Sequence, residues 1–501
     1  MVELHRSKTR LLIQTARTRS GRSLLPLGTS MSNSPSAQAS SISRQDTNRI
    51  LALTVILSAQ LMLQMDFLIV MVALPQIQAD LGFSPAALSW VPNAFALALG
   101  GLLLLGGRIG DVYGRVRAFK FGVAIFVLAS LLGGLANSPL VLVAARVLQG
   151  IGAAIAAPSV LALVMNIARS EAERNRGLAL FITVSSVGAS AGLILGGALT
   201  EYFSWRWSLL INVPVGILIL LMIGKVVKET ASQRAQFDMG GALTATAGSI
   251  ALVFGFINAA EHGWAHFATL PSFVVAVALL TAFWMIEGRV QQPLLNLNLL
   301  RNRTRIVALA VMAIIVGMHF SMLFLVVQYF QKVLGFGPLA AGLAYLPVTC
   351  TVFAVTHFMP GLIERFGASR LQLSGCLLVA CSFIGFAIID IGGSYAGSVL
   401  GPMLVHSLGI ALVFTPGTVL TMDGVAAEQS GTASGLLQMD QQIGGALGIA
   451  VVTSVFAISS LPGDFVSGLP VAFGAAALLS VMAAVLTCVI TFRSTALTRP
   501  T

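Results

Sequence analysis

Two oppositely charged side chains stand inside long apolar segments of this sequence. Asp66 lies in LMLQMDFLIVMVALP, and Arg146 lies in PLVLVAARVLQGIGAAIAAP. If both segments are helices, Asp66 lies about 13 Å from the end of its helix and Arg146 about 10 Å from the start of its own, because each residue adds about 1.5 Å. Both of these helix ends are expected at the same face of the membrane. We therefore expect the two charges to meet or to share a water-filled cavity. Burial of charge in such a place requires a reason, which is either a permanent ion pair or a site that exchanges protons.

Other polar side chains in apolar segments are candidates for binding substrate or carrying protons. Asp440 stands near the middle of such a segment in SGLLQMDQQIGGALG, next to Gln441. It fits either a locally hydrogen-bonded structural carboxylate or a substrate or proton site. His319 and His357 each stand alone in an apolar segment, which fits a packed histidine or a proton relay. Two aromatic side chains are candidate substrate contacts: Phe320 and Phe324.

The stretch GGRIGDVYGRVR (106–117) mixes glycine with alternating charge between two apolar segments. Glycine permits a sharp turn and close packing, and Asp111 can cap the next helix or pair with an arginine. We expect a gating loop that latches the protein in one state, because a merely solvated loop does not need this mixture. The residues of this predicted gating loop are Gly107, Asp111, Gly114, Arg115 and Arg117.

A second glycine pattern occurs in GASAGLILGG (188–197), where Gly188, Gly192 and Gly196 recur every four residues and Gly197 follows. Residues at this spacing share one face of a helix, and small residues let membrane helices approach closely. The pattern predicts a helix-packing motif, and by itself it does not indicate a direction of transport.

The elements that must position these side chains are apolar helices. Of the 501 residues, 56% are hydrophobic and only 9% are charged, whereas a soluble domain has about a quarter of its residues charged. The apolar runs extend for about twenty residues, which suits a helix that crosses a bilayer and exceeds the strands of a membrane barrel. The net charge of +11 does not indicate nucleic-acid binding, because most of the basic residues lie in the N-terminal segment and in short loops.

Counting these runs predicts an all-α polytopic membrane protein with fourteen spans. We expect a disordered cytoplasmic segment at 1–47 (with translation starting at Met31), then the following parts: a six-helix bundle at 48–226, two inserted spans at 227–290, a second six-helix bundle at 291–492 and a cytoplasmic tail at 493–501. Cytoplasmic termini leave only Arg206 and Lys332 as basic loop residues on the opposite side, as the positive-inside rule requires. The expected location is a bacterial-type inner membrane.

No cofactor and no metal are expected. The four cysteines lie in apolar segments without paired spacing. The glycine-rich string QGIGAA (149–154) lies inside a span with no preceding strand, so it is not a dinucleotide site. The sequence holds no phosphate-binding GxxxxGK[ST] loop, which argues against an ATP-driven pump and leaves a proton gradient as the energy source. We expect no enzymatic activity and a monomer in the lipid bilayer.

Four of these stretches resemble motifs of the major facilitator superfamily, and in particular of its fourteen-span EmrB/QacA-type drug:proton antiporters. They are LMLQMDFLIVMVALP, GGRIGDVYGR, LVAARVLQGIGAA and WRWSLLINVPVG. The resemblance covers about residues 48 to 492. It implies the major facilitator fold, with Asp66 coupling transport to protons and Arg146 assisting the proton transfer. One position departs from the antiporter motif gxxxGPxxGG, because Leu193 stands where that motif has proline.

The sequence thus predicts a secondary active transporter that exports amphipathic or cationic drugs in exchange for protons by alternating access. Its partners would be a small-molecule substrate, protons and lipid, and not nucleic acid. The alternatives are a dedicated exporter of one endogenous metabolite and a proton symporter. A membrane-bound enzyme lacks a catalytic motif in the loops, and a receptor or scaffold leaves Asp66 and Arg146 unexplained.

Overall fold

The computed structural model describes residues 35–168, 170–229, 238–290, 293, 295, 297–388, 393–425, 429–461 and 463–497. Within this part of the chain, fourteen helices are long and apolar enough to cross a membrane. The predicted all-α fold class with fourteen spans is therefore confirmed. Most of the N-terminal segment, including Met31, lies outside the described residues. Residues 49–501 form one compact unit.

The helices follow one another along the chain and differ widely in length. They are α1 (Pro35–Leu81), α2 (Trp90–Tyr113), α3 (Arg115–Gly134), α4 (Pro139–Ile167), α5 (Glu171–Tyr202), α6 (Trp207–Leu210), α7 (Asn212–Val226), α8 (Met239–His262), α9 (Thr269–Glu287), α10 (Arg303–Lys332), α11 (Pro338–Ala344), α12 (Leu346–Phe366), α13 (Ala368–Ala387), α14 (Leu400–Met422), α15 (Ser430–Ser459) and α16 (Leu469–Leu497). Three further short helical turns are η1 (Ala87–Ser89), η2 (Leu297–Arg301) and the π-helical turn η3 (Tyr395–Val399).

Helix α1 starts earlier than the sequence predicts, and α5 lacks the proline of the antiporter motif. The first helix begins at Pro35, within the segment that was expected to be disordered, whereas the candidate membrane span within this helix begins at Arg49. The lead-in from residue 36 to 47 holds no glycine or proline, and a helix extends easily once it has formed. In α5 the helix runs without interruption through Leu193, the position at which the antiporter motif has proline. A proline there would remove a backbone hydrogen bond of this helix.

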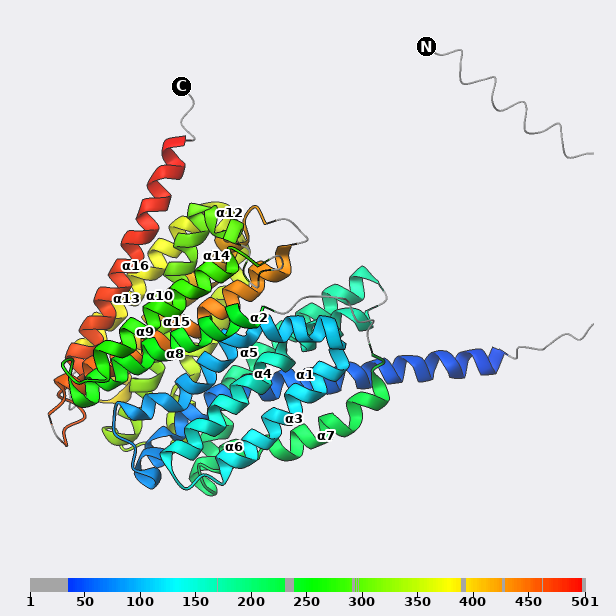
Figure 1. The fold of residues 1–501 in the computed structure, drawn as a ribbon, viewed down its shortest axis with the longest axis horizontal. Helices are drawn as coiled ribbons and strands as arrows, with labels where there is room; N and C mark the ends of the chain where they lie inside the picture. Colours follow the sequence, from blue (N-terminus) through cyan, green and yellow to red (C-terminus); the bar gives the residue numbers. More distant parts are fainter. Residues whose placement is uncertain are drawn as a thin grey trace, which may run out of the picture. The chain divides into compact units, whose positions relative to one another are not determined.

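The helices form two groups that we call the first half (α1–α7, from residue 49) and the second half (α10–α16). In the first half α3 and α2 each pack against α4, and in the second half α13 packs against α14 and α16 while α10 packs against α15. The halves meet where α2 contacts α15 and where α5 contacts α11. The hairpin of α8 and α9 lies beside the first of these contacts, with α8 against both α2 and α15 (Figure 1).

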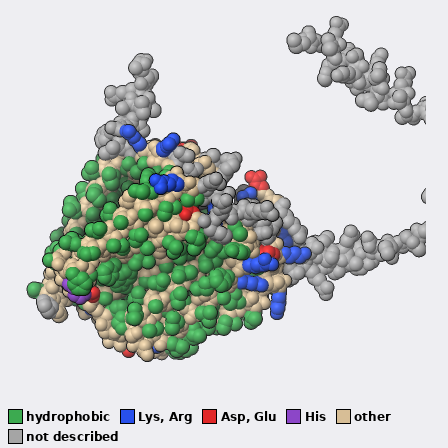
Figure 2. Space-filling view, viewed as in Figure 1, with side chains coloured by type: hydrophobic (Ala, Val, Ile, Leu, Met, Phe, Trp, Pro, Cys, Tyr) green, Lys and Arg blue, Asp and Glu red, His purple; other side chains and the backbone are tan. Residues whose placement is uncertain are grey.

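The outer surface is apolar over a broad area. Figure 2 shows hydrophobic side chains over the middle of one face, with lysines and arginines gathered toward its upper and right-hand edges. Exposed large side chains include Phe121 on α3, Leu221 on α7 and Val277 on α9. A soluble monomer rarely exposes so large an apolar patch, whereas lipid-facing helices require one because hydrocarbon cannot hydrate polar groups.

Three of the four motif glycines of α5 lie against α1, whereas the fourth, Gly197, lies against Pro338 of α11. A Cβ atom added at Gly192 would come within 2.8 Å of the Met65 carbonyl oxygen, and one added at Gly188 would come within 3.2 Å of Gln64 and Leu61. At Gly196 the added atom would lie 2.3 Å from the carbonyl oxygen of Ile69. The absence of side chains therefore allows the two backbones to approach, and this contact holds α1, which carries Asp66, in place.

Replacing Gly196 with alanine is expected to destabilise the protein by about 1–3 kcal/mol, because the new methyl group overlaps backbone that cannot rotate away. The matched control is Gly474→Ala on α16, where an added Cβ has no neighbour within 4 Å and alanine favours the helix. Thermal unfolding of the purified protein in detergent measures both changes. Equal melting temperatures for the two variants would show that α1 and α5 do not pack this closely.

Candidate functional site

The structure brings Asp66 of α1 and Arg146 of α4 into direct contact. Arg146 Nη1 lies 2.5 Å from Asp66 Oδ2, and both side chains have 0% of their surface exposed. Arg146 Nε donates a second hydrogen bond to the carbonyl oxygen of Val91 at 3.1 Å. The guanidinium carbon also lies 4.6 Å from the ring centre of Phe95 on α2, a cation–π contact. Three helices thus position this one ion pair.

Neutral polar side chains complete the surroundings of the carboxylate. Gln149 Nε2 and Asn212 Nδ2 both donate to Asp66 Oδ1, at 3.0 Å and 2.7 Å. Gln149 also accepts from Arg146 Nη1 at 2.8 Å and donates to the hydroxyl of Ser130 at 2.8 Å. These three residues are not among the sequence-predicted site residues. The available signal was that each is polar within an apolar span, where an unpaired polar group is costly.

The ion pair of Asp66 and Arg146 is inaccessible to solvent in this conformation. Asp66 has no exposed surface, so its carboxylate cannot exchange a proton with water unless the surrounding helices move. The second terminal nitrogen of the arginine, Nη2 of Arg146, is buried and has no hydrogen-bond partner among the described residues. A buried charge with one unmade hydrogen bond is less stable than a fully bonded one, so this environment does not satisfy the whole guanidinium.

The predicted gating loop is bound within the first half. Arg115 forms an ion pair with Asp111 and donates to the carbonyl oxygen of Gly107 at 3.3 Å. Gly114 adopts a φ of +97°, which favours glycine. The carboxylate of Glu229, beyond α7, accepts from the backbone N–H groups of Val116 at 2.9 Å and of Arg117 at 3.0 Å. These contacts hold the start of α3 and do not join the two halves.

Asp440 differs from Asp66 in its contacts. It has no hydrogen bond or ion pair with any described residue, and its Oδ2 is buried. Its neighbours one helical turn away, Leu436 and Gly444, are both buried, and Gly444 lies against Ala313 of α10. Asp440 therefore lies on the face of α15 that packs toward α10, and it keeps part of its surface exposed. Gln441 is partly buried and does not bond to Asp440.

The two predicted histidines do not come together. His319 Nδ1 lies 3.2 Å from Nε2 of His406 on α14, a residue that was not predicted. His357 is exposed on α12, with its ring against Phe358. Among the described residues, no group of three or more His, Cys, Asp or Glu side chains could hold a metal ion.

The two predicted phenylalanines also differ. Phe320 lies with its ring centre 4.9 Å from that of Phe67 in an edge-to-face contact between α10 and α1, and thus between the halves. Phe67 directly follows Asp66 in the chain, so this contact adjoins the buried ion pair. Phe324 is 1% exposed and belongs to the hydrophobic core. Phe320 is thus the one at the junction of the halves, and it remains only partly buried.

Hydrogen bonds join the halves at the end where α1 and α10 finish. Gln76 Nε2 donates to Gln331 Oε1 at 2.9 Å, and Gln331 Nε2 donates to the carbonyl oxygen of Val72 at 2.7 Å. Lys332 Nζ donates to Gln78 Oε1 at 2.7 Å. At the same end, the backbone N–H of Leu339 on α11 donates to Glu201 of α5 at 2.8 Å. The structure is therefore a state in which the two halves are closed at this end.

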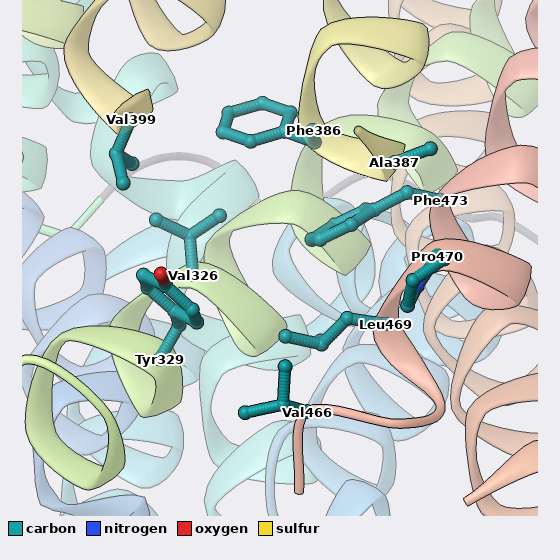
Figure 3. Close-up of a pocket in the computed structure, with 9 residues that line it drawn as sticks. All are labelled: Val326, Tyr329, Phe386, Ala387, Val399, Val466, Leu469, Pro470 and Phe473. Atoms are coloured by element: carbon teal, nitrogen blue, oxygen red, sulfur yellow. The ribbon is translucent and has the colours of Figure 1, made fainter. Parts of the chain in front are cut away.

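An apolar pocket lies at the same end of the second half (Figure 3). The rings of Tyr329, Phe386 and Phe473 line it, together with aliphatic side chains from α10, η3 and α16. None of the sequence-predicted site residues lines this pocket. Among the described residues, no charged side chain lines the pocket, which therefore suits an apolar group.

Comparisons with known proteins identify the family to which this chain belongs. The Major Facilitator Superfamily profile matches residues 56–449. The puromycin resistance protein pur8 of Streptomyces alboniger is 36% identical over 82% of this chain and 82% of its own. The cephamycin export protein CmcT of Amycolatopsis lactamdurans is 35% identical over 88% and 92%.

Among solved structures, the peptide transporter POT in complex with sulfate superposes with a TM-score of 0.65. That match covers 88% of this chain and 94% of the other at 13% identity, which supports the fold alone. The sequence profile and the two relatives support more than the fold, because they match most of this chain in sequence. The chain belongs to the major facilitator superfamily and is a multi-pass membrane transporter rather than an enzyme.

Proposed function

We propose that this transporter exports amphipathic or cationic small molecules in exchange for protons. The observation that carries the proposal is the buried contact between Asp66 and Arg146, 2.5 Å apart with no exposed surface. A structural ion pair of this kind contributes little net stability, because desolvation of two charges offsets their attraction. A site that couples transport to protons needs such a pair, since a proton bound to the carboxylate removes the negative charge and leaves Arg146 without an ionic partner.

The hydrogen bonds around the carboxylate indicate where the proton enters. Oδ1 of Asp66 already accepts from Gln149 and Asn212, so its two lone pairs are used. Among the residues that the structure describes, Oδ2 accepts from Arg146 alone, so it has a lone pair left for a proton. Protonation there neutralises the carboxylate next to the guanidinium, and Arg146 loses its ionic partner. This would favour the conformation in which the halves separate at the closed end.

The relatives' names support export of small molecules, since one is a resistance protein and one an export protein. We propose the inner membrane of a bacterial-type cell as the location, with both termini in the cytoplasm. In that orientation the end where α1 and α10 finish faces outward, so the structure is closed to the outside. The protein would act as a monomer and need no cofactor, since the proton gradient supplies the free energy, about 2.3 kcal/mol per charge per 100 mV.

Transport in proteoliposomes tests the proposal. Purified protein would be reconstituted and loaded with ethidium, a permanent cation, with and without a pH gradient across the membrane. Exchange for protons predicts that an opposing pH gradient drives uphill movement of ethidium and that dissipating the gradient stops it. Movement in the same direction as the protons would instead indicate a symporter, and equal rates under both conditions would show that protons are not coupled.

Alternating access predicts that locking the closed end stops transport. With the native cysteines replaced, Gln76→Cys and Gln331→Cys would be joined by a reducible bifunctional thiosulfonate reagent across the contact between α1 and α10. We expect transport to fall to background and to return when the link is reduced. Each single-cysteine variant, treated in the same way, is the matched control. Full transport by the linked protein would contradict the idea that these ends separate.

A dedicated exporter of one metabolite is the second candidate. The 35% identity to CmcT, a protein named for the export of cephamycin, favours it. The two candidates differ in how many compounds compete for transport. Inhibition of ethidium movement by chemically unrelated cations would support broad export, whereas a deletion strain that accumulates a single product would support the dedicated exporter.

A further inference from the structure

The second half contains a buried chain of polar groups that the proposed mechanism does not use. His319 of α10 contacts His406 of α14, with 3.2 Å between Nδ1 and Nε2. His406 Nδ1 in turn lies 3.2 Å from the hydroxyl oxygen of Ser382 on α13. That hydroxyl donates to the carbonyl oxygen of Val379 at 2.7 Å. Three helices therefore converge on this chain, just as three converge on Asp66.

The contacts determine which nitrogen of each ring carries a hydrogen. Ser382 has one hydroxyl hydrogen, and it is directed to Val379. The hydrogen between Ser382 and His406 must then come from Nδ1 of His406, which leaves Nε2 of His406 as an acceptor. His319 must supply the hydrogen of the next bond from its own Nδ1. The opposite direction would satisfy only two of the three contacts, so this assignment follows from the network.

The chain can take up one proton without losing a hydrogen bond. With Nδ1 of His319 carrying a hydrogen, its Nε2 is unprotonated. That nitrogen bonds to no described residue, and His319 keeps part of its surface exposed, whereas His406 has none. A proton added at Nε2 makes His319 a cation and keeps all three contacts. A second proton, on Nε2 of His406, would break the bond between the rings and bring two positive charges together.

The surroundings of His319 link it to the junction of the halves. Its ring centre lies 5.6 Å from that of Phe320, which contacts Phe67 on α1. Among the described residues, His406 is the ionisable group that contacts His319. The structure shows no bond from the histidine pair to the other described carboxyl, imidazole and thiol groups between the ends of the surrounding spans, which are Asp66 on α1, Cys350 and His357 on α12, Cys376 and Cys381 on α13, Asp440 on α15 and Cys488 on α16.

We propose that His319 is a one-proton site at which a proton and a cationic substrate exclude each other. The neutral ring offers Nε2 as an acceptor beside the ring of Phe320, whose centre lies 5.6 Å away and which in turn contacts Phe67. An acceptor close to aromatic rings suits a flat cation with N–H groups. The protonated ring carries the same charge as that ligand and no longer accepts a hydrogen bond. This inference rests on the proposed export of cations and assigns their subsite to the second half, away from Asp66.

Binding of ethidium to the purified full chain in detergent tests the exclusion. We expect the dissociation constant to rise at least threefold between pH 8 and pH 3.5 in the wild type. In His319→Gln, which keeps a hydrogen-bonding side chain but cannot be protonated, it should change less than twofold. His357→Gln is the matched control, because that histidine is exposed and separate from the chain, and it should behave as the wild type. Wild-type pH dependence in His319→Gln, or no ethidium binding by the wild type, would overturn the proposal.

Two further measurements separate this inference from the proposed function and from misfolding. In Asp66→Asn the pH effect on ethidium binding should persist even if transport is lost, so failure of the Asp66 mechanism leaves the His319 result unchanged. Nitrogen-15 NMR of histidine-labelled protein reports the tautomer directly. It should show His406 with its hydrogen on Nδ1 in the wild type and a change in Ser382→Ala. A hydrogen on Nε2 of neutral His406 would overturn the proposed chain.

Discussion

Asp66→Asn is expected to reduce proton-driven transport at least a hundredfold while leaving the protein folded in the membrane. Asparagine keeps the size of the side chain and an oxygen that can accept from Gln149 or Asn212, but it cannot bind and release a proton. Transport driven by a pH gradient in proteoliposomes measures the loss. Exchange of ethidium at equal concentrations on both sides, which needs no proton, should continue.

The matched control for this variant is Asp80→Asn on the same helix. Asp80 also pairs with an arginine, Arg206, at 2.5 Å, and accepts from the indole N–H of Trp205 at 2.9 Å, but its side chain is 45% exposed. An exposed ion pair contributes about 0–1 kcal/mol, so this variant should transport at close to the wild-type rate. Proton-driven transport by Asp66→Asn at more than half the wild-type rate would exclude Asp66 as the coupling group.

Arg146→Met is expected to destabilise the protein strongly, and the double variant Asp66→Asn/Arg146→Met is expected to recover most of that loss. Removing only the guanidinium leaves Asp66 buried without its positive partner, which costs about 3–5 kcal/mol. Removing both charges avoids this cost, so the double variant should unfold within about 1 kcal/mol of the wild type. Thermal unfolding in detergent measures the stability of all three variants.

Transport measurements on the same variants distinguish an ion pair that only stabilises the fold from one that couples transport to protons. If Asp66 and Arg146 only hold helices together, the stable double variant should also recover transport. If they couple protons to movement, the double variant should be stable and inactive. Recovery of both stability and proton-driven transport would therefore refute the coupling role, whereas recovery of stability alone would support it.

The two members of the ion pair could be predicted from the sequence because burying a charge in an apolar span costs much free energy. A charged side chain within an apolar span is expensive, so Asp66 and Arg146 stand out, and their similar depths indicate that they meet. Gln149, Asn212 and Ser130 carry no charge and are tolerated in a helix whether or not they serve a site. Their gathering around Asp66 depends on how α3, α4 and α7 rotate about their axes, which composition and spacing do not specify.

The candidates in the second half show the limits of depth as a criterion. Asp440 and His319 were chosen because they lie in apolar spans, yet Asp440 has no hydrogen-bond partner among the described residues and His319 bonds to His406. His357 meets the same criterion and is exposed on α12. Position along a helix gives the depth of a side chain, and the partner depends on which helix lies against that face.

The sequence by itself determined that this chain is an all-helical membrane protein with fourteen spans. That follows from local physics, because a bilayer excludes unpaired backbone groups and sets a length of about twenty apolar residues for every span. Only the tertiary structure decided that Asp66 and Arg146 are sealed together, that the halves are closed where α1 and α10 finish, and that His319 has a partner. Those features arise from contacts between helices distant in the chain, and a single sequence carries no local signal for them.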